Sequence, residues 1–218
     1  MRSSDDETAE FPLHIPAGAA KWRPNPLRAH GAWVYLFASI ASGALVGVER
    51  GVEPAMLAGT AYAGAFLLVA ALDSGMHGKL KRAILGAAVA LGSAALALTW
   101  GASPDFFYVA AIATLPAAAA VALAKWRGVL STATLLSGIA TLTLSAPVAA
   151  IAGGADYLQS AALFALLFPF FSWRAARIAV PLRHGKGWNR DALRARGLRE
   201  AAIAACWSLL VTFALRVA

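Results

Sequence analysis

The sequence predicts an all-α fold, a polytopic transmembrane helix bundle with about seven spans. Apolar residues make up 60% of the 218 residues and charged residues only 14%, and the charges are absent from several long windows. A soluble domain carries about 25% charged residues, so this chain has too little polar surface to cover a globule in water. Helices rather than a barrel are expected, because no segment alternates polar and apolar residues with a period of two.

Seven charge-free windows reach or approach the length that crosses about 30 Å of hydrocarbon as a helix. We expect the spans at residues 31–48, 54–72, 83–100, 106–124, 128–152, 157–173 and 201–215. Residues 1–25 are acidic at first and then rich in proline and small residues. This composition predicts a disordered cytoplasmic tail in front of a bundle that occupies residues 26–218.

The charges between the windows predict the orientation of the bundle. Basic loops alternate along the chain with loops that are acidic, and the most basic one, residues 174–199, joins the last two windows. Basic loops stay in the cytoplasm according to the positive-inside rule. We therefore expect a multi-pass protein of the bacterial cytoplasmic (inner) membrane, with the N-terminus inside and the C-terminus outside.

The same features exclude several classes of site. Cys206 is the single cysteine and lies in an apolar window, which excludes disulfide scaffolds and cysteine-based metal sites. The net charge of +8 comes from segments that set orientation, so we expect no nucleic acid as a partner. The windows contain no ionisable residue, which disfavours a proton-coupled carrier. We expect no cofactor, no bound metal and no catalytic residue.

Pairs of small residues four apart predict that some helices pack closely. Such pairs let two helix backbones approach each other in lipid, where packing drives association. The pairs are Gly59 with Ala63, Gly86 with Ala90, and Ala88 with Gly92.

Basic and aromatic residues at the cytoplasmic ends of the windows form the candidate binding site. Several guanidinium groups around one opening can hold a phosphate or an anionic lipid headgroup, and an interfacial histidine can donate a hydrogen bond to it. The alternative is that these residues only set the orientation and contact lipid headgroups. The candidates are His30, Trp33, Arg82, Arg127, Arg174 and Arg177.

A stripe of hydroxyl side chains follows the fifth window. Thr134, Ser137, Thr141 and Ser145 are spaced three, four and four residues apart, so they share one helical face. Such a face lines a polar cavity or packs inside the bundle, because a hydroxyl can also bond the carbonyl four residues earlier in its own helix. Both alternatives stay open at the level of the sequence.

The motif His30-Gly31-Ala32-Trp33, with basic residues on alternate loops, resembles the YwiC-like family of bacterial integral membrane proteins. The resemblance covers most of the chain after the tail. That family is distantly similar to the UbiA-type prenyltransferases, helical bundles that hold magnesium at a cytoplasmic active site through two aspartate-rich motifs. This chain departs from those motifs, because Asp73 is the one acid at the first position and residues 173–177 contain none at the second. Metal-assisted ionisation of a prenyl diphosphate is therefore not expected.

Three functions follow from these observations. The leading hypothesis is an inner-membrane protein that binds an anionic lipid or isoprenoid-type headgroup at its cytoplasmic face, or that serves a membrane-protein partner as an accessory subunit. The second is a diverged prenyltransferase-like enzyme in which Asp73 and His30 act. The third is a small-solute transporter that uses the hydroxyl face of the fifth window.

Overall fold

A computed structural model describes residues 30–73, 79–128, 131–183 and 190–217, and the expected tail lies outside them. The described residues form helices and no strand, which confirms the all-α bundle. The helices are α1 (His30–Val46), α2 (Val52–Asp73), α3 (Lys79–Thr99), α4 (Phe106–Arg127), α5 (Thr132–Thr143), α6 (Ser145–Ala152), α7 (Tyr157–Arg183) and α8 (Arg190–Val217). Six helical segments are long and apolar enough to cross a membrane, and the shorter Ala32–Val46 adds a seventh. The chain is thus a multi-pass membrane protein.

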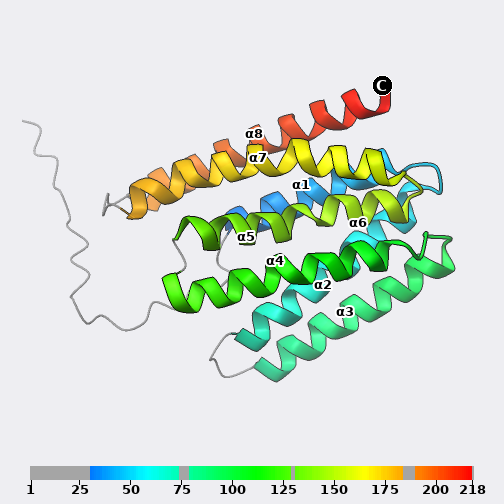
Figure 1. The fold of residues 1–218 in the computed structure, drawn as a ribbon, viewed down its shortest axis with the longest axis horizontal. Helices are drawn as coiled ribbons and strands as arrows, with labels where there is room; N and C mark the ends of the chain where they lie inside the picture. The colour runs from blue at the N-terminus through cyan, green and yellow to red at the C-terminus, as the bar shows by residue number, and fades with distance from the viewer. Residues whose placement is uncertain (1–29, 74–78, 129–130, 184–189, 218) are drawn as a thin grey trace, which may run out of the picture.

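The spans run alternately in opposite directions, so that their connections gather at two ends (Figure 1). One end holds the start of α1 and the connections α2–α3, α4–α5 and α7–α8; we call it the basic end. The other end holds the connections α1–α2, α3–α4 and α6–α7 together with the end of α8; we call it the closed end. The basic end carries Lys81, Arg82, Lys125, Arg127, Arg174, Arg177 and Arg199.

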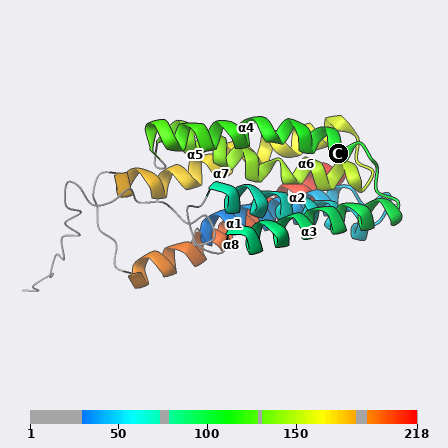
Figure 2. The same ribbon diagram turned by 90° about the horizontal axis from the view of Figure 1, so that it is seen from below.

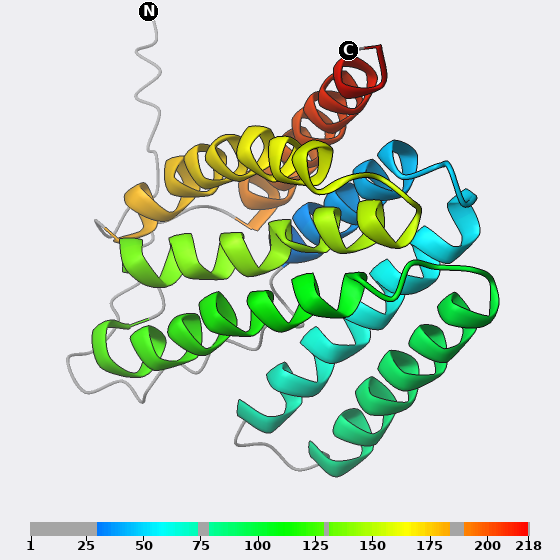
Figure 3. The same cartoon turned by 45° about the vertical axis from the view of Figure 1, so that its right-hand side comes forward.

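Helices α5 and α6 form one span, Thr132–Ala152, that is interrupted after Thr143. Pro147 contributes to the interruption, because it has no N–H to donate to the carbonyl of Thr143 and its ring would clash with that carbonyl in a regular helix. We expected one uninterrupted helix here. Every residue of α6 is buried. It packs against α1, α2, α4 and α7, and so occupies the centre of the bundle (Figure 3).

Helices α1 and α6 meet at the level of their backbones. A Cβ added to Gly43 would overlap the carbonyl oxygen of Ala146, and one added to Gly47 would overlap that of Ala150. The glycines are four residues apart, as are the alanines that they face, so this contact is a small-residue motif on both helices. We did not predict it, although its spacing is that of the pairs named from the sequence.

The pairs named from the sequence have different outcomes. A Cβ on Gly86 would lie 2.7 Å from the backbone nitrogen of Leu68 in α2, so the close packing expected at this position is confirmed. Gly59 packs closely against Ile40 of α1. The expectation for Ala88 and Gly92 is wrong, because nothing described lies within 4 Å of a Cβ on Gly92. Helix α3 lies at the edge of the bundle, mainly against α2 (Figure 3), and both Ala88 and Gly92 are exposed.

The segment expected as a basic loop is mostly helical. Helix α7 continues to Arg183 and α8 begins at Arg190, within the segment 174–199. Arginine, alanine and leucine dominate this segment, and all three are good helix formers. The charge-free windows therefore mark the apolar part of these two helices and not their ends.

Candidate functional site

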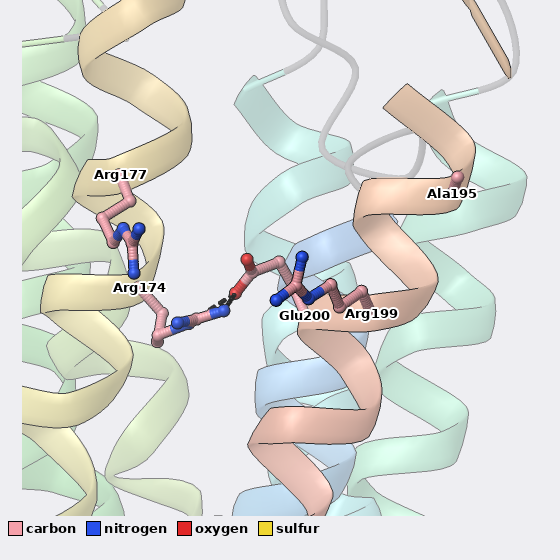
Figure 4. Close-up of a pocket in the computed structure, with 5 residues that line it drawn as sticks. All are labelled: Arg174, Arg177, Ala195, Arg199 and Glu200. Atoms are coloured by element: carbon pink, nitrogen blue, oxygen red, sulfur yellow. Dashed lines mark hydrogen bonds and ion pairs between the residues drawn. The ribbon is translucent and has the colours of Figure 1, made fainter. Parts of the chain in front are cut away.

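A pocket of about 390 Å³ opens between α7 and α8 at the basic end (Figure 4). Its lining residues are Arg174 and Arg177 from α7 and Ala195, Arg199 and Glu200 from α8. The two helices separate toward this end of the bundle (Figure 2). Three of the lining side chains are cationic and one is anionic, so the described lining has a net charge of +2 (3 − 1). This charge favours an anionic ligand.

Arg174, which is buried, and Glu200, which is partly buried, form an ion pair across the pocket. The Nε of Arg174 donates to Oε2 of Glu200 at 2.5 Å, and Nη2 lies 2.5 Å from the same oxygen. The two side chains are 9% and 11% exposed. Both residues lie inside the apolar spans Tyr157–Ala179 and Gly197–Val217. The expectation that the spans carry no ionisable residue is therefore wrong for this pair, because the helices extend beyond the charge-free windows.

Aromatic side chains hold α7 and α8 together beneath the ion pair. The rings of Phe170 and Trp207 stack with their centroids 4.7 Å apart, and Nε1 of Trp207 donates to the carbonyl of Leu166 at 3.2 Å. Tyr35 of α1 is buried against Phe171, with ring centroids 4.8 Å apart. The two helices thus meet at these rings and separate beyond them, which places the pocket at the mouth of the bundle.

Two cations of the pocket remain available to a ligand. Arg177 and Arg199 are exposed, and among the side chains that the structure describes neither has an acidic partner. The guanidinium of Arg177 lies 5.2 Å from the centroid of the Trp173 ring, a cation–π contact that restricts its position. Because Glu200 neutralises Arg174, the net charge of +2 belongs to Arg177 and Arg199.

The structure brings Arg174 and Arg177 together and leaves the other candidates elsewhere. Trp33 stacks on Phe37 at 5.7 Å and meets Phe66 of α2 edge-on at 6.1 Å, so it belongs to the contact between α1 and α2. The remaining candidates lie at the same end on other helices or outside the described side chains. Arg82 is exposed on α3, Arg127 is exposed at the end of α4, and the side chain of His30 is not among those described.

We did not single out Arg199 and Glu200 from the sequence. A usable signal was present, because Glu200, Ala204, Ser208 and Thr212 are four residues apart and share one face of a helix. Ala204, Ser208 and Thr212 are buried. A charged residue in line with small and hydroxyl residues indicates a packed face, and therefore a partner for the charge.

The hydroxyl stripe of the fifth span bonds mainly to carbonyls of its own segment, and Ser145 also donates to the carbonyl of Leu36 in α1 at 3.4 Å. Thr134 donates to the carbonyl of Gly128 at 3.0 Å, Thr141 to that of Ser137 at 2.9 Å and Ser145 to that of Leu142 at 2.7 Å. Thr134, Thr141 and Ser145 are buried. This arrangement corresponds to the packing alternative, while cavity lining stays a prediction.

Among the described residues, no three His, Cys, Asp or Glu side chains lie close enough together to hold a metal ion. The side chain of Asp73, at the end of α2, lies outside the described set. Comparison of the chain with protein-family models, with curated proteins and with solved structures finds no match. The resemblance to the YwiC-like family stays a prediction.

Proposed function

We propose that this membrane protein binds an anionic lipid or isoprenoid-type headgroup in the pocket between α7 and α8. One observation carries the proposal: Arg177 and Arg199 line the pocket from different helices, are exposed and have no acidic partner among the described side chains. A guanidinium offers a planar fork of donors that fits phosphate oxygens. In this proposal, the headgroup lies between these two forks.

The position of the pocket supports a lipid ligand. It lies where the apolar spans Tyr157–Ala179 and Gly197–Val217 begin or end, which is the depth at which headgroups lie in a bilayer. The positive-inside rule supports the basic end as the cytoplasmic one, in a bacterial inner membrane with the N-terminus inside. The resemblance of His30-Gly31-Ala32-Trp33 to the YwiC-like family supports the same location.

The other hypotheses have less support from the described side chains. A prenyltransferase-like reaction rests on Asp73 and His30, whose side chains lie outside the described set. A transporter rests on hydroxyls that already donate to main-chain carbonyls. A role as an accessory subunit requires a membrane-protein partner. Headgroup binding needs only the guanidinium groups that line the pocket.

The test compares the lipids that co-purify with the wild type and with the double variant Arg177→Gln/Arg199→Gln by native mass spectrometry. Arg127→Gln is the matched control, because Arg127 is an exposed arginine of the basic end that does not line the pocket. We expect an anionic lipid on the wild type and the control that is lost from the double variant. Equal retention by all three proteins would show that the arginines serve orientation alone.

A further inference from the structure

The charge of the pocket indicates which class of headgroup it takes, an inference that rests on the proposed function. We propose that the pocket selects a dianionic phosphate monoester over a monoanionic phosphodiester. The lining residues Arg174 and Glu200 are committed to each other at 2.5 Å. Arg177 and Arg199 then present two positive charges, one from each helix.

Charge balance distinguishes the two classes of ligand. A phosphate monoester carries close to two negative charges above its second pKa of about 6, and it therefore balances both guanidinium groups. A phosphodiester carries one negative charge and leaves one guanidinium without a counter-charge. At the edge of a low-dielectric layer that difference is weakly screened, so the monoester is favoured.

The number of phosphate oxygens leads to the same preference. A bidentate contact with one guanidinium uses two oxygens. A monoester has three terminal oxygens, so it can bond Arg177 in this way and still offer one to Arg199. A diester has two such oxygens and must share them. The ring of Trp173 restricts the Arg177 guanidinium, which reduces the ordering cost of the bidentate contact.

Exposed apolar side chains neighbour pocket-lining residues along both helices. Trp173 is 54% exposed on α7 and Leu198 is 67% exposed on α8, one residue before the pocket-lining Arg199. In this proposal, the tail of a lipid whose headgroup lies in the pocket contacts exposed apolar side chains such as these. A soluble phosphate monoester shares the headgroup chemistry but makes no use of this apolar surface.

The experiment titrates the purified full-length protein in a neutral detergent with dioleoyl phosphatidic acid and with its methyl ester, dioleoyl phosphatidylmethanol. The two lipids differ in one methyl group and one charge. At pH 8 we expect phosphatidic acid to bind about tenfold more tightly, as measured by native mass spectrometry. At pH 5.5 the preference should shrink, because phosphatidic acid then carries close to one charge. Arg177→Gln and Arg199→Gln should each reduce the preference, and Arg127→Gln should keep it.

The possible failures are distinguishable. In one outcome, the wild type binds the two lipids equally at pH 8 while Arg177→Gln and Arg199→Gln bind both more weakly. This result would overturn the selection of dianions and leave the proposed function standing. Binding that neither variant weakens would overturn both. Millimolar inorganic phosphate distinguishes the two sources of the headgroup: retention of phosphatidic acid supports a lipid ligand, and its displacement overturns the lipid assignment in favour of a soluble phosphate.

Discussion

The two ends of the bundle are held together by different interactions. At the closed end, the backbone N–H of Arg50 donates to the carbonyl of Gly153 at 2.8 Å, and that of Ser103 donates to the carbonyl of Ala152 at 3.0 Å. These bonds join the α1–α2 and α3–α4 connections to the end of α6. At the basic end, a side-chain ion pair between Arg174 and Glu200 bridges α7 and α8, with a pocket beside it.

This difference indicates that the residues that stabilise the bundle are not the residues that bind the ligand. The contacts of α6 use backbone groups and small residues, and at the closed end the exposed side chain of Arg50 adds a bond to the carbonyl of Gly101 at 3.4 Å. The basic end uses one ion pair to hold its helices and keeps the guanidinium groups of Arg177 and Arg199 exposed. We therefore expect substitutions in the ion pair and in the α1–α6 contact to change stability, and substitutions of the two exposed arginines to change binding.

Arg174→Ala is expected to have the largest effect on the basic end. It leaves Glu200, which is 11% exposed, without its partner, and we expect the free energy of unfolding to fall by about 3 kcal/mol. Denaturant titration of the purified protein in detergent measures this change. The double variant Arg174→Met/Glu200→Met removes both charges and should recover most of the loss. A double variant as unstable as Arg174→Ala would contradict the assignment of the loss to the unpaired charge of Glu200.

Gly43→Ala tests the backbone contact between α1 and α6. The new Cβ overlaps the carbonyl oxygen of Ala146, and we expect a loss of about 2 kcal/mol from overpacking. Gly92→Ala is the matched control, because nothing described lies within 4 Å of its new Cβ and the exchange favours the helix. If the two variants unfold at the same temperature, the close contact is not what stabilises this part of the bundle.

Arg177→Gln is expected to change binding and not stability. Its side chain is exposed and has no acidic partner among those described, so the free energy of unfolding should stay within about 0.5 kcal/mol of the wild type. The affinity for phosphatidic acid should fall about tenfold, because a charge-assisted contact is lost. Lipid titration by native mass spectrometry and denaturant titration on the same preparation provide both values. A loss of stability without a change in affinity would show that Arg177 has a structural role and does not bind the ligand.

Trp173→Leu should have the smallest effect of the four. It removes the ring that lies 5.2 Å from the Arg177 guanidinium, and a cation–π contact at an exposed site contributes about 0.5–1 kcal/mol. We expect the affinity for phosphatidic acid to fall about threefold, in line with that contribution. Trp126→Leu is the control, since Trp126 is 83% exposed at the end of α4, away from the pocket lining. Equal losses in the two variants would indicate general interfacial anchoring.

The sequence was sufficient to predict the helical bundle, because each span needs its own run of apolar residues whatever its neighbours are. It was not sufficient to predict which cations share a pocket. Arg82 and Arg127 lie at the same end as Arg174 and Arg177 but on α3 and α4, and the charge pattern along the chain does not encode which helices are adjacent. The pairing of Arg174 with Glu200 was missed for the same reason, since it depends on α7 lying beside α8.

The break between α5 and α6 has a local contribution, because Pro147 removes the hydrogen bond to Thr143. Pro116 and Pro169 lie inside the continuous helices α4 and α7, however, so a proline in a span does not by itself predict an interruption. The Gly43–Gly47 contact could have been proposed from its spacing. Its partner on α6, however, is set by the fold.

The most direct test of the account is an experimental structure of the protein in lipid nanodiscs that contain phosphatidic acid. The account predicts a phosphate between the guanidinium groups of Arg177 and Arg199, with Arg174 still paired to Glu200. A pocket without a bound lipid, with phosphates spread evenly around the arginines of the basic end, would contradict it.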